Sequence, residues 1–424
     1  MAAVAPTQQD AATEPGAGRS ARPRLLLWLA PLALLVLPLL VYGHTLNNGW
    51  VIAPADDLRW LSLVQGTPLR DLPSWFSHQE AFFYRPLARL SLYLDSLVWG
   101  SDPFGFRLSG LLLYALAALA LGGLVCELTG SRRAGALAAA GYELFPGNWE
   151  VAYWVSARAD LLAALFVFLT LTLLHRAWHQ RRLACWLGGL GCTAAALFSK
   201  ETGLALLPVV VVWALVAMPP LRRSGRYWAW VGLTLGLLLA LAAGYWTLRS
   251  GATYMGTQHL APLRQGQLRL LGAMKMGGEW WWHTPLWDLH RLCTGHAPGV
   301  AALLAVPGVF LEWWGGLLSW LGGVVLVART RLRTGLMLAA FYPLALLPVC
   351  REIATVPYRR FYYLPVAGSL ALTGIACWAL MTWSRRYGSL AWAASVATTV
   401  ILLASSAWGC YLISAGLGSR LFGR

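Results

Sequence analysis

The sequence has no hydrophilic stretch long enough to fold as a soluble domain. Its 424 residues are 58% hydrophobic and only 12% charged, and the mean hydropathy is +0.58. The longest hydrophilic segments are the N-terminal residues 1–22 and two loops, 44–105 and 250–299. A transmembrane helix needs about 20 mostly apolar residues, and runs of this kind fill the rest of the chain. The composition therefore predicts a polytopic membrane protein and excludes an ordinary soluble enzyme.

Three further features of the composition narrow the class of protein. The seven cysteines form no Cys-x-x-Cys pair, and most lie inside apolar runs, where a thiol behaves as a small hydrophobic group. The net charge is +16, but the basic residues are spread over short loops and form no contiguous basic domain, which excludes a nucleic-acid partner. Lysine occurs only at Lys200 and Lys275, so Lys200, at a turn between two apolar runs, is a candidate functional residue.

The apolar runs and the loop charges together predict an all-α fold with about eleven transmembrane helices. Short turns that are basic and free of Asp and Glu occur at residues 132–133, 175–182, 222–226, 329–333 and 385–386. Turns of this kind are typical of cytoplasmic loops. The acidic residues and the remaining arginines alternate with these turns, and we expect them on the extracytoplasmic or lumenal face.

These features predict a single transmembrane domain over residues 23–414. Residues 1–22 are expected to form a disordered cytoplasmic tail, and residues 415–424 a short C-terminal tail. The first span, residues 25–42, lacks a small-residue cleavage site and is interpreted as a retained anchor instead of a signal peptide. The protein would lie in the plasma membrane of a bacterium or in the endoplasmic reticulum of a eukaryote.

Both large loops carry features of their own. In the first loop, 44–105, apolar residues follow Pro86 at helical spacing and end before Gly100, which predicts an interfacial helix. Aromatic residues interleave with it, as expected for a segment lying at the membrane surface. In the second loop, 250–299, residues 268–290 are re-entrant, interfacial or spanning, and the sequence leaves this open. The run His290–His296 fits no standard zinc spacing and is interpreted as a polar loop.

Asp56 and Asp57 follow the first span, where nothing in the formation of a membrane helix requires two adjacent carboxylates. One of them could cap a helix that begins near Leu58, because Asp is a favoured N-cap. A cap explains one acid and not both. The catalytic interpretation is a general base, with a neighbour that binds substrate or a divalent metal ion. We expect Asp56 and Asp57 to have different roles because successive residues of an extended segment point to opposite sides.

Four cations accompany these acids from distant parts of the chain, namely Arg85, Arg158, Lys200 and Arg360. Arg85 stands at the start of the interfacial helix, where a guanidinium and the helix N-terminus both favour phosphate. Arg158 enters an apolar run together with Asp160, and charged residues at such depth usually line a cavity or pathway. The alternatives are an interfacial anchor for Arg85 and a mutual salt bridge between Arg158 and Asp160.

Five motifs in order resemble a known family: Asp56-Asp57, Tyr84-Arg85-Pro86-Leu87, Ser156-Ala157-Arg158-Ala159-Asp160-Leu161-Leu162, Phe198-Ser199-Lys200-Glu201 and Arg360-Phe361-Tyr362-Tyr363-Leu364-Pro365. The chain resembles polytopic glycosyltransferases of the C fold class. Within that class it resembles the membrane part of the tetratricopeptide-repeat O-mannosyltransferases and their bacterial relatives. Two departures are Arg359, where an acid is expected before the arginine, and the lack of a repeat domain after the last predicted span.

The resemblance implies transfer of a sugar from a polyprenyl-phosphate donor to a hydroxyl acceptor, with inversion, on the extracytoplasmic face. It implies Asp56 as the base, with Asp57 beside it, and Arg85, Arg158, Lys200 and Arg360 as a clamp on the donor phosphate. Supporting residues would be His78, Tyr84, Asp160, Glu201 and Tyr363. The resemblance implies no certain cofactor, and a divalent metal ion at Asp56 and Asp57 stays open. The partners would be the donor and membrane lipid, and the acceptor is not specified. The alternative function is a flippase for lipid-linked sugars or another transporter.

Overall fold

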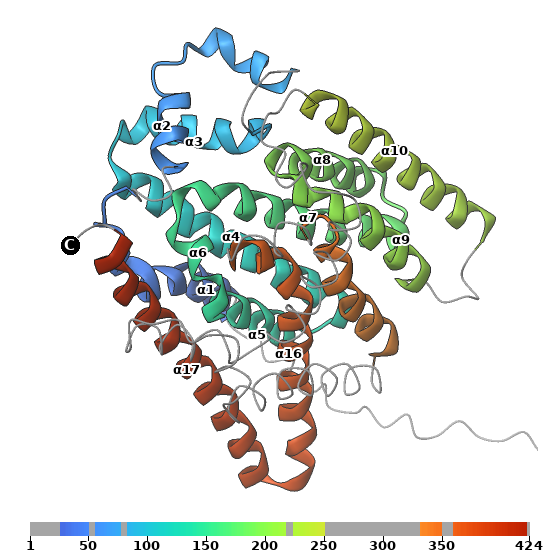
Figure 1. The fold of residues 1–424 in the computed structure, drawn as a ribbon. Helices are drawn as coiled ribbons and strands as arrows, with labels where there is room; N and C mark the ends of the chain where they lie inside the picture. Colours follow the sequence, from blue (N-terminus) through green and yellow to red (C-terminus); the bar gives the residue numbers. More distant parts are fainter. Residues whose placement is uncertain are drawn as a thin grey trace, which may run out of the picture.

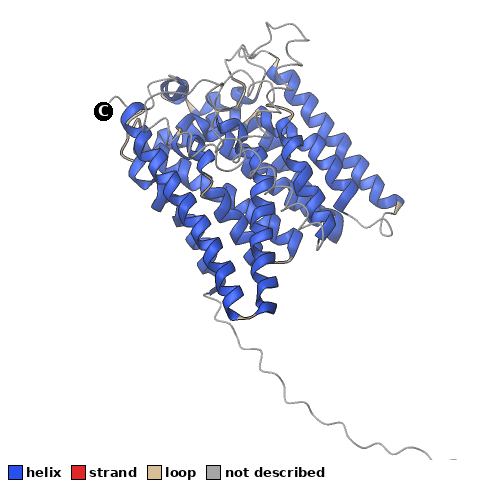
Figure 2. Ribbon diagram, turned by 60° about the horizontal axis from the view of Figure 1, so that its bottom comes forward, coloured by secondary structure: helices blue, strands red, loops and turns tan. Residues whose placement is uncertain are grey.

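The computed structural model describes residues 26–50, 56–77, 83–217, 224–250, 331–349 and 359–421 (Figures 1 and 2). Within these ranges the chain is helical and contains no strand. The helices are α1 (Leu26–Tyr42), α2 (Asp56–Val64), α3 (Pro86–Trp99), α4 (Pro103–Thr129), α5 (Arg132–Glu143), α6 (Trp149–Tyr153), α7 (Arg158–Gln180), α8 (Leu183–Ser199), α9 (Leu206–Ala217), α10 (Gly225–Arg249), α16 (Tyr363–Ser384) and α17 (Ser389–Leu421). A further helical stretch covers residues 331–346.

Short 3₁₀ segments join several of these helices. They are η1 (Gly43–Thr45), η2 (Leu69–Phe76), η3 (Pro146–Asn148), η4 (Val155–Ala157), η5 (Glu201–Ala205), η7 (Arg359–Tyr362) and η8 (Arg385–Tyr387). Most of them lie at one end of the helix bundle, where the chain also carries its buried charged side chains. We call this end, with the segments η1, η3, η4, η5 and η7 and the helices α2 and α3, the polar end.

Five helical segments of the described chain are long and apolar enough to cross a membrane. They are Pro103–Thr129, Val155–Gln180, Gly225–Arg249, Arg360–Tyr387 and Ser389–Tyr411. Shorter apolar helices are Leu29–Thr45, Leu183–Ser199 and Glu201–Val216. The prediction of an all-α polytopic membrane protein is therefore confirmed. Residues 251–330 and 350–358 fall outside the described residues, including most of the predicted second loop and the apolar run that follows it, so the number of eleven spans stays a prediction.

The centre of the bundle is built from α4, α5, α7 and α16, which pack closely because small residues face each other. A Cβ atom on Gly374 of α16 would lie 2.5 Å from the backbone nitrogen of Ala138 in α5. A Cβ on Gly122 of α4 would lie 2.8 Å from the carbonyl oxygen of Gly135 in α5. Close helix approach through small residues is the usual packing mode within membranes. The hairpin of α16 and α17 extends away from this centre, as Figure 1 shows.

Local signals in the sequence define several helix ends. The predicted interfacial helix is α3, which begins at Pro86 and ends before Gly100 at φ +61°, so the helix is confirmed and its place at the membrane surface stays a prediction. Asp102 caps α4, because its side chain accepts a hydrogen bond from the backbone of Phe104 at 3.0 Å. Ser131 caps α5 in the same way through Ala134. These caps satisfy backbone N–H groups that a helix start otherwise leaves unpaired.

The first loop folds over one end of the bundle as a small unit of its own, made of α2, η2 and α3 (Figure 1). Its aromatic residues pack with one another instead of all lying at the membrane surface. The cluster contains Trp60, Leu61, Val64, Trp75, Leu92 and Tyr93, together with Phe106 of α4 and Val155 of η4. Burial of this cluster fixes the loop on the starts of α4 and α7, and so places its acidic residues beside the bundle.

Candidate functional site

The acidic pair lies in the first turn of α2, which begins at Asp56. The helix expected near Leu58 is present and begins two residues earlier, so both acids are helical and the extended segment assumed for them is wrong. Asp57 is buried, and its Oδ1 accepts a hydrogen bond of 2.9 Å from the backbone N–H of Ser156. This contact ties the first loop to the segment that opens α7. The side chain of Asp56 lies outside the described part of the structure.

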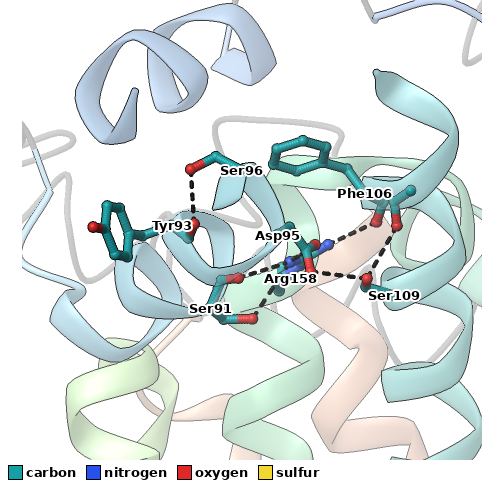
Figure 3. A network of polar contacts seen from close by, with 8 residues as sticks. Ser91, Tyr93, Asp95, Ser96, Phe106, Ser109 and Arg158 are labelled. Carbon is teal, nitrogen blue, oxygen red and sulfur yellow. Dashed lines mark hydrogen bonds and ion pairs between the residues drawn. The ribbon is translucent and has the colours of Figure 1, made fainter. Parts of the chain in front are cut away.

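Arg158 lies at the centre of a polar network between α3, α4 and α7 (Figure 3). Its side chain is 1% exposed and forms an ion pair with Asp95 of α3. The same guanidinium donates to the carbonyl of Phe106 at 2.6 Å, and to the carbonyl and hydroxyl of Ser91 at 3.3 and 3.4 Å. Asp95 in turn accepts a hydrogen bond of 2.9 Å from the hydroxyl of Ser109. The network holds α3 on the bundle.

Asp160 does not pair with Arg158, so the mutual salt bridge considered for these two residues is wrong. Its partner is Lys200, whose ammonium donates to Asp160 Oδ1 at 2.6 Å. Both side chains are buried, with exposures of 1% for Lys200 and 5% for Asp160. The Lys200 ammonium also lies 4.9 Å from the ring centroid of Phe361. This pair joins the start of α7 to the end of α8.

A second pair joins the first loop to the same region. Arg85 forms a bidentate ion pair with Glu201 of η5, with distances of 3.2 and 2.6 Å. Burial lowers the pKa of the Arg85 guanidinium, but the adjacent Glu201 carboxylate more than compensates, so the pKa lies above its ordinary value. The guanidinium also stacks on Phe83 at 4.3 Å. Bidentate pairing of this kind adds geometric specificity to the charge interaction.

Arg360 approaches from η7, at the start of α16. Its backbone N–H donates to Glu150 Oε2 at 2.9 Å. Its guanidinium lies 4.3 Å from the ring centroid of Trp154 and 5.8 Å from that of Phe361. The Lys200 ammonium and the Arg360 guanidinium therefore both lie within cation–π distance of the Phe361 ring.

The structure brings three of the four predicted cations together. Lys200 and Arg360 both lie near the ring of Phe361, and Arg85 pairs with Glu201, the residue that follows Lys200. Arg158 has other partners, namely Asp95, Ser91 and the carbonyl of Phe106. The polar end thus has two adjoining parts. One part is Asp57 with Arg158, and the other is the group of Arg85, Lys200 and Arg360 around Glu201, Asp160 and Phe361.

The predicted supporting residues have different surroundings. Tyr84 is buried, and its hydroxyl donates to the carbonyl of Phe76 at 2.9 Å, so it fastens the first loop. Tyr363 is buried in the helix core, where its carbonyl accepts from the hydroxyl of Tyr142 at 2.7 Å and the two rings lie 4.8 Å apart. His78 lies outside the described residues. In the part of the chain that is described, no three His, Cys, Asp or Glu side chains gather as metal ligands.

Three charged residues of the polar end did not enter the predicted site. Asp95 holds Arg158, Glu150 holds the backbone of Arg360, and Arg107 of α4 donates to three backbone carbonyls. Arg107 and Glu150 had a usable signal, because each is a charged residue at the start of an apolar run. Asp95 had none beyond its position on the interfacial helix.

The fold of the chain is similar to that of solved proteins. An archaeal oligosaccharyltransferase, AglB from Archaeoglobus fulgidus, was solved with an inhibitory peptide and a dolichol-phosphate. It superimposes with a TM-score of 0.52 at 13% identity, covering 93% of this chain and 56% of that one. The apo form of the oligosaccharyltransferase from the same organism gives a TM-score of 0.54 at 13% identity, covering 96% of this chain and 57% of that one. The fold is therefore that of the C class of glycosyltransferases.

Sequence similarity points to a narrower group within that class. Residues 86–246 match the family model of dolichyl-phosphate-mannose-protein mannosyltransferases. The mouse protein O-mannosyl-transferase TMTC1 is 28% identical over 205 residues, which are 42% of this chain and 21% of that protein. The chain thus spans about a fifth of the mouse relative and little more than half of the archaeal enzymes. The resemblance to the membrane part of the O-mannosyltransferases, predicted from the motifs, is confirmed.

Proposed function

We propose that this integral membrane protein is a glycosyltransferase that uses a polyprenyl-phosphate-linked hexose, such as mannose, as its donor. The acceptor is a hydroxyl group, the anomeric centre is inverted, and the reaction takes place on the extracytoplasmic or lumenal face. The observation that carries the proposal is that a buried acid, Asp57, is held by the segment that leads into Arg158, and that the buried cations Arg158 and Lys200 lie at the same end of the bundle.

The reaction is a single displacement. A carboxylate of the acidic pair takes the proton of the acceptor hydroxyl, and the hydroxyl oxygen attacks the anomeric carbon. The bond from that carbon to the phosphate oxygen breaks, and polyprenyl phosphate leaves with the bonding electrons. We assign the base to Asp56 and a positioning or acceptor-holding role to Asp57, whose Oδ1 is fixed by Ser156 at 2.9 Å. A positioned base contributes about 10²–10⁴ in rate.

Three of the four predicted cations are held in ion pairs before the donor binds. Arg85, Arg158 and Lys200 each have a carboxylate partner in Glu201, Asp95 and Asp160. Their charge is therefore largely balanced, and their geometry is fixed before the donor binds. Negative charge that develops on the leaving phosphate is stabilised best by donors that do not have to reorganise. We assign the direct phosphate contacts to Lys200 and Arg360, which both lie within cation–π distance of Phe361.

The donor class is supported by the relatives. The archaeal oligosaccharyltransferase of this fold was solved with a dolichol-phosphate, and the matching family model describes mannosyltransferases that use dolichyl-phosphate-mannose. A transporter is not favoured, because substrate sites of secondary transporters lie near the membrane midplane between broken helices. Here the buried charges of the first loop, α7 and α8 lie at one end of the bundle.

Binding of the donor tests the assignment of the cations. The variant Arg360→Ala should bind polyprenyl-phosphate mannose about 10-fold to 150-fold more weakly, the loss of one charge-assisted contact of roughly 1.5–3 kcal/mol. Arg176→Ala is the matched control, since Arg176 pairs with Glu127 at 2.8 Å and lies at the opposite end of α7. Equal donor affinity of Arg360→Ala, Arg176→Ala and the wild type would contradict the phosphate assignment.

A further inference from the structure

Arg107 is a buried cation of α4 whose partners are backbone groups. Its side chain is 4% exposed. The guanidinium donates to the carbonyl oxygens of Asn48 at 3.2 Å, Gly49 at 2.7 Å and Tyr153 at 2.7 Å. It also lies 5.0 Å from the ring centroid of Tyr153. Burying a charge in this way is unfavourable unless it is well hydrogen-bonded, so the arrangement holds the three carbonyls strongly.

The two segments that Arg107 joins are the ones that lead to Asp57. Asn48 and Gly49 stand at the start of the first loop, eight and seven residues before Asp56. Tyr153 precedes Ser156, whose backbone N–H donates to Asp57 at 2.9 Å. The side-chain amide of Asn48 adds a contact of 3.4 Å to the hydroxyl of Tyr153. Arg107 therefore ties the start of the first loop to the segment in which Ser156 holds Asp57.

A guanidinium suits the position because its planar fork presents five N–H donors in fixed directions. A lysine ammonium carries the same charge, but it is a compact group on a flexible stem and does not reproduce that fork.

We propose that Arg107 is a positioning residue for the acidic pair, setting where the base of the transfer reaction stands relative to the donor. This inference rests on the proposed function of the polar end. Arg107 acts through the backbone of the first loop and η4, and not by contact with the sugar or phosphate. Its loss should therefore lower kcat while the KM for the donor stays nearly constant.

The experiment compares full-length Arg107→Gln, Arg107→Lys and the control Arg176→Gln with the wild type. Kinetics with polyprenyl-phosphate mannose should show kcat about 10-fold or more lower for Arg107→Gln, with a donor KM within about 3-fold. Arg107→Lys should recover less than half of the lost rate, and Arg176→Gln should match the wild type. In an Asp57→Asn background, adding Arg107→Gln should lower kcat by less than a further factor of about 2, because the effects of residues that act as one unit are not additive.

Hydrogen exchange measured by mass spectrometry gives a readout that does not depend on activity. Arg107→Gln should speed exchange at residues 46–50 and 153–157, while Arg176→Gln should leave these peptides unchanged. An inactive wild type with this exchange pattern would overturn the proposed function and leave the positioning of the loop intact. Unchanged exchange in Arg107→Gln, wild-type kcat, or a full additional rate loss on top of Asp57→Asn would each overturn the inference about Arg107.

Discussion

The buried pair of Lys200 and Asp160 gives a prediction with a definite magnitude. The two side chains are 1% and 5% exposed and meet at 2.6 Å, so solvent and salt hardly screen them. The change Lys200→Met leaves the Asp160 carboxylate buried without its cation. Breaking a buried pair from one side costs about 3–5 kcal/mol, whereas replacing both partners by apolar residues is often neutral or stabilising.

The assay is thermal unfolding of the protein in detergent. A loss of about 3–5 kcal/mol should lower the Tm of Lys200→Met by about 6 °C or more, at roughly 2 °C per kcal/mol for a large domain. The double variant Lys200→Met with Asp160→Leu should recover most of that loss. Arg176→Met is the control, because Arg176 is 44% exposed and its pair with Glu127 should contribute less than about 1 kcal/mol.

The double variant also separates stability from function. If Lys200 contacts the donor phosphate as proposed, the stable double variant should still bind polyprenyl-phosphate mannose at least about 10-fold more weakly than the wild type. A Lys200→Met variant with the Tm of the wild type would refute the structural reasoning about this pair. A double variant with full donor affinity would instead remove Lys200 from the phosphate site.

Two further variants test the packing of the core. Gly374→Ala should destabilise the protein by about 1–3 kcal/mol and lower the Tm, because its Cβ would lie 2.5 Å from the backbone of Ala138. Gly236→Ala is the control and should leave the Tm unchanged, because a Cβ at Gly236 meets open space. Glu143→Met should raise the Tm, since among the described residues the buried Glu143 carboxyl has no hydrogen-bond partner and such a group costs about 1–3 kcal/mol. A Tm unchanged by Gly374→Ala, or lowered by Glu143→Met, would contradict these interpretations.

Much of the architecture could be predicted because it depends on local patterns. Apolar length and loop charge indicated a polytopic helical protein, and Pro86 with the following leucines indicated the helix that is observed as Pro86–Trp99. The close approach of α5 and α16 could not be predicted, since it depends on Gly374 meeting Ala138 across more than two hundred residues of sequence.

The candidate site, too, could be predicted only in part from the sequence. The charge and depth of Arg158, Asp160 and Lys200 marked them as unusual, but the partner of a buried charge is chosen by the tertiary fold. Arg158 pairs with Asp95 and Asp160 with Lys200, so the mutual pair suggested by their spacing is absent. Arg107 could be noticed as a charged residue at the start of an apolar run, but its role could not be predicted, because it donates to backbone carbonyls, which every residue carries.

The most direct test of the central claim is the release of polyprenyl phosphate from labelled polyprenyl-phosphate mannose by membranes that contain the protein. The account predicts that wild-type membranes consume the donor, and that Asp56→Asn lowers turnover by about 100-fold or more while donor binding persists. Asp57→Asn should lower turnover less. Donor that crosses the membrane without being consumed, or equal turnover in the wild type and both Asn variants, would contradict a transferase built on this acidic pair.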